Sequence, residues 1–265
     1  MESNLKFIAK KLKPATAHEN RLPIFSASNR PKHETKTFVT PHGTVTIDGR
    51  LGQRHKDLLE LIRILARDVK RTKNGKLLVF VEVYKLRKFL SINKSENNKK
   101  RVYSWETLRK LMWDIMKTTI SVKIPSIDID AAGQFITSYV PVKEEDTLFG
   151  QKIILKIEFG EIGTQLFAKD FILDYNPIPL LELEHGISKA IARYCLSHRN
   201  QPKGGWKLDV LFKTLLGENA TPQAIKDAKR FLKKDTEQLV KCGIIIKNDR
   251  VFLSKPTESL PPMVE

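Results

Sequence analysis

A helix predicted over residues 222–242 carries amide and cationic side chains along one side. Its apolar residues recur every three or four positions and must face the interior: Ile225, Ala228, Leu232 and Leu239. The opposite side holds Gln223, Lys226, Arg230, Lys233 and Lys234. In the major groove of DNA, arginine can pair with guanine and glutamine with adenine, whereas lysine more often contacts phosphates. The pattern predicts contacts with a DNA duplex; the alternative is an ordinary solvated helix face.

The limits of this helix and the hairpin after it are also marked in the sequence. Thr221 suits the N-cap and Pro222 the first helical position, while Gly243 suits the position after the C-cap. An apolar run, an Asn248-Asp249 turn and a second short strand then predict a hairpin. Its turn region offers further DNA contacts at Lys247, Asn248 and Arg250.

A second, weaker cationic face is predicted in the first half of the chain. Ser104 can cap a helix whose apolar seam is Trp105, Leu108, Met112 and Ile115. The seam residues Trp105 and Met112 are expected in the core, not as a base-stacking platform. The cationic residues expected to contact the DNA backbone or a partner are Arg101, Arg109, Lys110 and Lys117.

The residues typical of an enzyme active site do not form a recognisable pattern. The chain contains no GxxxxGK[ST] phosphate loop, and its 6 histidines are separated along the sequence, so each is expected at the surface or at a helix cap. Cys195 and Cys242 are not in a CxxC spacing, which disfavours a zinc site or a disulfide framework. We therefore expect no catalytic residues, no metal ligands and no cofactor.

Composition favours a polyanionic partner. The 265 residues include 47 Lys plus Arg and 30 Asp plus Glu, which gives a formal net charge of +17. Residues 185–255 are the most one-sided, with 15 basic and 6 acidic side chains. The chain has no apolar run long enough to span a bilayer and no secretory signal, so we expect a cytoplasmic protein with no membrane contact.

The predicted elements divide the chain into two folded domains of the α+β class. An order of helix, strand, helix, helix and hairpin strands occurs twice, which is typical of two tandem winged-helix domains. The expected divisions are a flexible basic arm over residues 1–42, a first domain over 43–176, a second over 177–255 and a tail over 256–265. The first helix is expected over 53–69, and the Asn176–Pro179 segment, which should break regular structure, is the expected junction.

This order, together with the residues 49–59, GRLGQRHKDLL, resembles the iteron-binding plasmid replication initiators, in particular the TrfA-like group. The resemblance covers residues 43–255. It implies binding of repeated origin DNA, a homodimer in equilibrium with a monomer, opening of the origin and recruitment of the host helicase. It also implies a DNA-contact role for Lys226, Arg230, Lys233 and Lys234, and a mixed DNA and dimerisation role for the first domain.

A short apolar cluster in the expected arm suggests one further partner. The segment RLPIF at residues 21–25 is similar to bacterial sliding-clamp-binding peptides, although it lacks the glutamine that those peptides prefer at their first position. Leu22, Ile24 and Phe25 would then make the clamp contacts. The alternative is that these side chains dock on their own domain.

The sequence is also compatible with two other functions. A winged-helix transcription repressor would have the same fold and no role in replication. A DNA-nicking enzyme of rolling-circle replication would need a close pair of histidines and a nucleophilic tyrosine.

Overall fold

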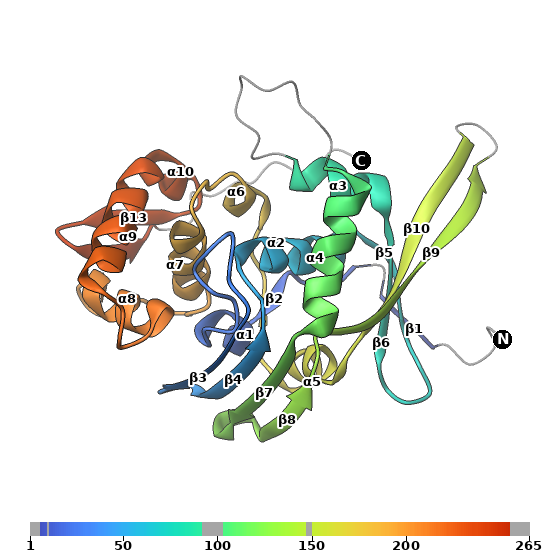
Figure 1. Ribbon diagram of the computed structural model, residues 1–265, viewed down its shortest axis with the longest axis horizontal. Helices are drawn as coiled ribbons and strands as arrows, with labels where there is room; N and C mark the ends of the chain where they lie inside the picture. Colours follow the sequence, from blue (N-terminus) through green and yellow to red (C-terminus); the bar gives the residue numbers. More distant parts are fainter. Residues whose placement is uncertain (1–5, 10, 92–102, 147–149, 255–265) are drawn as a thin grey trace.

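The computed structural model describes residues 6–9, 11–91, 103–146 and 150–254. The chain is a mixed α and β protein, so the predicted α+β class is confirmed (Figure 1). Beside a small cluster of Ala15, Ala17 and Leu173, two large hydrophobic clusters form its interior: the larger one draws mainly on residues 22–166 and the smaller one on residues 180–251. We call the parts around these clusters the first and second unit.

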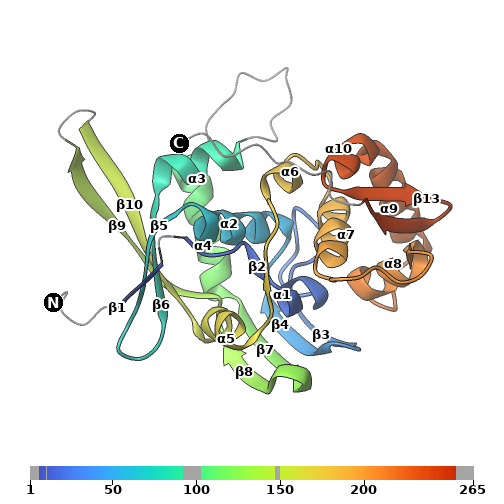
Figure 2. The same ribbon diagram turned by 180° about the vertical axis from the view of Figure 1, so that it is seen from behind.

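The first unit holds most of the strands. In chain order it contains β1 (Lys6–Ala9), β2 (Ala15–Thr16), α1 (Ala17–Arg21), β3 (Glu34–Thr40), β4 (Gly43–Gly49), α2 (Gln53–Ile64), β5 (Ala66–Arg71), β6 (Leu77–Glu82), α3 (Val83–Leu90), α4 (Trp105–Lys117), β7 (Thr119–Ile124), a 3-10 turn (Pro125–Ile127), β8 (Ile129–Gly133), β9 (Ile136–Asp146), β10 (Gly150–Phe159), α5 (Glu161–Lys169) and β11 (Ile172–Leu173). One sheet has the order β1-β5-β6-β10-β9 and another the order β3-β4-β7-β8, while β2 pairs with β11. The hairpin of β9 and β10 projects from the body of the molecule (Figures 1 and 2).

The second unit is smaller and follows a short connecting helix, α6 (Ile178–Leu181). Its elements are α7 (Gly186–Leu196), β12 (Trp206–Lys207), α8 (Leu208–Leu216), α9 (Pro222–Lys234), α10 (Thr236–Lys241), β13 (Ile244–Lys247) and β14 (Arg250–Leu253). Its sheet has the order β12-β14-β13.

The two units share an order of elements. In the first, α2, β6, α3, α4, β9 and β10 follow one another with β5, β7 and β8 inserted; in the second, the series is α7, β12, α8, α9, β13 and β14. In each sheet the last strand of the series lies between the other two strands of the series, because β10 pairs with both β6 and β9 and β14 pairs with both β12 and β13. Under this correspondence α4 and α9 are equivalent helices.

The expectation of a flexible arm over residues 1–42 is wrong for its described part. This part contributes β1, β2, α1 and β3, and Leu22, Ile24 and Phe25 are only 2%, 0% and 6% exposed. Backbone hydrogen bonds fix the apolar cluster, because Ser26 N donates to Leu51 O and Ile24 N donates to Leu22 O. The proposed clamp-binding side chains are therefore core residues of the first unit, and a sliding clamp cannot reach them in this fold.

Three predicted boundaries also differ from the structure. The helix expected over residues 53–69 ends at Ile64, and Val69 belongs to β5. A bulge between Ala66 and Asp68 buries both Ala66 and Val69, so their spacing of three imitates a helical period. The helix expected over 222–242 breaks at Asp235, whose carboxylate accepts a hydrogen bond from the backbone N–H of His185. The Asn176–Pro179 segment opens helix α6, because proline is tolerated in a first helical turn.

The two equivalent helices lie on one side of the molecule. In Figure 1 both α4 and α9 face the viewer, and in Figure 2 both lie behind other elements. In the part of the chain that the structure describes, no helix combines the length and apolar character that crossing a membrane requires.

Candidate nucleic-acid interface

Helix α9 begins and is oriented as the sequence predicts. The Thr221 hydroxyl accepts a hydrogen bond from Ala224 N at 3.2 Å, and Pro222 occupies the first turn. Ala228 and Leu232 are buried against the core of the second unit. The predicted contact residues all lie on the exposed side of the helix: Gln223, Lys226, Arg230, Lys233 and Lys234. All five side chains are therefore accessible to solvent.

One carboxylate holds two of these side chains in place. Asp227 accepts a hydrogen bond from Gln223 Nε2 at 3.1 Å and forms an ion pair with Arg230 Nη2 at 3.0 Å. The guanidinium of Arg230 also lies 5.1 Å from the centre of the Phe231 ring. Asp227 thus restricts the conformations of both side chains, and such restriction reduces the entropy that a side chain loses on binding a ligand.

The predicted hairpin follows α9 as β13 and β14. Asn248 and Asp249 have φ values of 51° and 52°, as a tight two-residue turn requires. Lys247 and Asn248 are exposed, whereas Arg250 is partly buried and donates a hydrogen bond to Gly204 O at 2.9 Å. Lys229 pairs with Asp249 at 3.3 Å and ties α9 to the hairpin. Of the three predicted hairpin residues, Arg250 is therefore engaged in holding a loop.

Helix α4 presents the cationic residues predicted for the first unit. Ser104 caps it by accepting from Thr107 N at 3.0 Å, Met112 is fully buried and Trp105 packs partly against the core. Arg109, Lys110 and Lys117 are exposed, and Arg101 lies outside the described residues. The two predicted cationic faces thus belong to helices that occupy equivalent places in the two units.

Trp113 is a surface residue that the sequence analysis missed. It lies on the exposed side of α4, with 51% of its surface exposed, and Lys117 Nζ is 4.8 Å from its ring centre. Its position, three residues after Lys110 and four before Lys117, could have revealed it, because that spacing places all three on one helix face. An exposed indole between cations can contact bases or the sugar-phosphate backbone.

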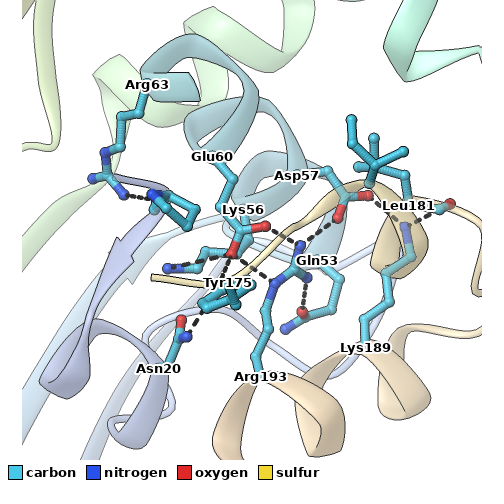
Figure 3. Close-up of polar contacts among 12 residues, drawn as sticks. Asn20, Gln53, Lys56, Asp57, Glu60, Arg63, Tyr175, Leu181, Lys189 and Arg193 are labelled. Carbon is cyan, nitrogen blue, oxygen red and sulfur yellow. Dashed lines mark hydrogen bonds and ion pairs between the residues drawn. The ribbon is translucent and has the colours of Figure 1, made fainter. Parts of the chain in front are cut away.

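A buried network of charges holds the two units in a fixed relation (Figure 3). Arg193 of α7 bonds to Glu60 and Asp57 of α2, with its Nη2 atom 2.7 Å from Glu60 Oε2 and 2.6 Å from Asp57 Oδ1. Lys189 Nζ lies 2.5 Å from Asp57 Oδ2. Burial disfavours the charged guanidinium, but the two carboxylates outweigh this and raise the pKa of Arg193. Helices α2 and α7 are therefore joined by ionised groups.

The network continues into the first unit through Glu19. Its carboxylate receives Lys56 Nζ at 2.5 Å and Arg63 Nη1 at 2.9 Å, and all three side chains are almost fully buried. Burial lowers the pKa of Lys56 to about 8, although the carboxylates of Glu19 and Glu60 act in the opposite direction. These contacts fix α2 against α7, and α4 packs on α2 while α9 packs on α7.

The expectation that every histidine is an isolated surface or capping residue is wrong. The ring of His42, in the β3–β4 turn, lies 6.3 Å from that of His18 and 5.8 Å from that of His198, between centroids. Burial, followed by the charges of Arg21 and the other two histidines, lowers the pKa of His42 to about 4. These rings line a contact between the first and second units.

One group of potential metal ligands exists among the described residues. The ligand atoms of Glu184, His185 and Asp235 lie within 4.8 Å of one another. Asp235 already accepts a hydrogen bond from His185 N at 3.1 Å, and its other carboxylate oxygen lies 3.2 Å from His185 Nδ1. Asp235 lies at the junction of α9 and α10, so its carboxylate links that junction to the residue that precedes α7.

Comparisons with family models, with curated proteins and with solved structures found no match to this chain.

Proposed function

We propose that the protein binds double-stranded DNA sequence-specifically through two winged-helix units and initiates plasmid replication, without an active site of its own. The observation that carries this proposal is the exposed side of α9, where Asp227 orients Gln223 and Arg230 among three lysines. Ordered amide and guanidinium groups suit base edges, and mobile lysines suit phosphates.

The repeated order of elements supports a winged-helix arrangement of each unit. Helix, strand, helix, helix and two hairpin strands, with the last strand between the other two, is the order expected of that fold, and α4 and α9 then take the place of the reading helices. The β13–β14 and β9–β10 hairpins would be the wings. Two reading helices on one side of the molecule favour a binding site that extends over more than one turn of DNA.

The choice of replication initiation rests on the resemblance to iteron-binding initiators. That resemblance also implies an equilibrium between homodimer and monomer and a contact with the host helicase, which we include in the proposal. A transcription repressor with the same fold would use the same surface, so the arrangement of its binding sites must separate the two functions.

Footprinting on the DNA that flanks the gene tests the proposal. Regularly spaced protected repeats are expected, and a plasmid that carries them should replicate only when the protein is supplied. A single protected palindrome with no effect on replication would instead indicate a repressor. Uniform weak protection would indicate charge-driven binding alone and would contradict sequence-specific reading.

A further inference from the structure

A short segment of the first unit lies between the two proposed reading helices. We call residues 29–32 the bridge segment. Residues 29–31 line a groove of about 340 Å³ together with Lys110 of α4. Residues 31 and 32 line a second groove, of about 210 Å³, together with Ala224 of α9. The bridge segment therefore borders the space beside both helices.

The bridge segment is held firmly by its neighbours. Asn29 Nδ2 donates to Glu184 O at 2.7 Å, which ties the segment to the second unit. Arg30 N donates to Ser28 Oγ at 3.0 Å. A Cβ atom on Gly52 would lie 2.7 Å from Pro31 Cδ, so this glycine allows the close approach of the segment to the start of α2. The cations of the segment thus project from a fixed backbone.

The groove beside α4 is lined by four cationic side chains and one carboxylate. The cations are Arg30, Arg50, Arg54 and Lys110, and the carboxylate is Asp114. Asp114 is engaged by Arg50 Nη2 at 2.7 Å and by His55 Nε2 at 3.3 Å. Burial would raise the pKa of Asp114, but the hydrogen bonds from His55 and Arg50 outweigh it and hold that pKa below its usual value. The single carboxylate is therefore already neutralised.

The remaining cations have no acidic partner. Among the described residues, Arg30, Lys32 and Lys110 form no ion pair, and all three are exposed. Arg54, also exposed, forms a side-chain hydrogen bond with Tyr103, which leaves its charge uncompensated. An excess of fixed positive charge along a groove is complementary to an anion that runs past it.

We propose that the bridge segment, with Arg54 and Lys110, binds phosphodiester groups of the DNA backbone in the interval between the stretches contacted by α4 and α9. This inference rests on the proposed function, because it assigns the DNA between the two reading helices to a definite site. Such contacts fix register and orientation without reading sequence. They would also hold both units on one continuous stretch of duplex.

The salt dependence of binding provides the first test. Each phosphate neutralised on B-DNA contributes about −0.9 to the slope of log K against log salt concentration. We call the duplex that binds most tightly in a selection from a random-sequence pool the selected duplex. The double variant Arg30→Gln, Lys32→Gln should reduce the magnitude of the slope by about 2, both on the selected duplex and on a duplex of random sequence. The matched control is Lys11→Gln, Lys73→Gln, which removes two exposed cations elsewhere that, among the described residues, form no ion pair. Equal slopes for the variant and the control would overturn the inference.

Directed cleavage provides the second test. Cys195 is fully buried, and burial raises its thiol pKa and raises that of Cys242 to about 12, so both react slowly near neutral pH. An iron chelate attached at the new thiol of the Arg30→Cys variant should cut the selected duplex between the two stretches that the wild-type protein protects. Cuts outside this interval, or no cuts on a duplex that the variant still binds, would contradict the inference.

The two proposals fail in distinguishable ways. If the wild-type protein protects no duplex, both fall. If it protects a defined duplex and Arg230→Ala abolishes that protection while the bridge variant keeps the wild-type slope, only the bridge inference falls.

Discussion

Arg193 of α7 and Glu60 of α2 form a two-bonded ion pair in the interior of the protein. Nε donates to Oε1 at 2.9 Å and Nη2 donates to Oε2 at 2.7 Å, and both residues are almost fully buried. A buried ion pair is weak evidence of net stabilisation, because desolvation offsets the attraction. It does require one arrangement of α2 against α7, and so contributes to the relative position of α4 and α9.

Removing one partner of this pair should destabilise the protein strongly. We expect Arg193→Ala to lower the free energy of unfolding by about 3–5 kcal/mol, because it removes the two-bonded partner of the buried Glu60 carboxylate and leaves Lys189 alone to pair with Asp57. Denaturant unfolding followed by circular dichroism measures this. Arg199→Ala, at an exposed position just after α7, is the control and should change stability by less than about 0.5 kcal/mol. Equal effects of the two substitutions would show that the pair has no special role.

Trp113 should report directly on contact with DNA. Trp206 is 7% exposed and Trp105 is half-buried, so a ligand on the exposed side of α4 should affect mainly the fluorescence of Trp113. Addition of duplex DNA is expected to quench tryptophan emission in the wild-type protein, and Trp113→Phe should remove most of that quenching. If the variant, at saturating DNA, loses the same share of its emission as the wild type, α4 does not contact the duplex.

Acid should weaken the contact that His42 makes between the units. The pKa of His42 is lowered from 6.5 to about 4, so between these values the unfolded chain binds a proton that the folded protein does not. The free energy of unfolding should therefore fall as the pH decreases through this range. His42 contributes a slope of at most about 1.4 kcal/mol per pH unit, and the actual slope should be smaller because the ring is only partly buried.

Urea unfolding between pH 7 and pH 4 checks this expectation. His42→Asn should make the decline in stability shallower than in the wild type, whereas His33→Asn, at an exposed position, should leave it unchanged. A His42→Asn profile parallel to that of the wild type would rule out His42 as the source.

The main helices and the hairpins after residue 43 were predictable from the sequence, but the elements of residues 6–40 and the packing between distant segments were not. Thr221, Pro222 and the apolar seam define α9 locally, and Asn248-Asp249 defines the hairpin turn, because caps and turns depend on neighbouring residues. The burial of Leu22 and Phe25 depends instead on contacts with residues from 51 onward, which no local pattern reveals. The same holds for the three histidines, which lie far apart in sequence and meet only in the folded chain.

The candidate site was predictable to a similar degree. Helical periodicity assigned the exposed side of α9, since one face must be buried. It could not show that Asp227 holds Gln223 and Arg230, because rotamers and side-chain pairing depend on the folded surface. It also gave no reason to group residues 29–32 with Arg54 and Lys110, because these come from three separate segments.

Asp227 should affect specificity more than affinity. In the Asp227→Asn variant, Arg230 loses its ion pair, so its guanidinium should become less ordered while the helix gains net positive charge. We expect binding to random-sequence duplex to stay equal or become tighter, and the preference for the selected duplex to fall by about threefold to tenfold, corresponding to about 1 kcal/mol. Fluorescence anisotropy with both duplexes measures the two affinities. A loss of affinity by the same factor for both duplexes would indicate damage to the fold.

The central claim is that the exposed side of α9 reads base sequence in duplex DNA. The most direct test compares wild type, Arg230→Ala and the control Lys73→Ala in their affinity for the selected duplex and for a random duplex at one salt concentration. The account predicts that Arg230→Ala loses about 1–3 kcal/mol on the selected duplex and much less on the random one, while the control changes neither appreciably. Equal affinities of wild type and Arg230→Ala for the selected duplex would contradict it.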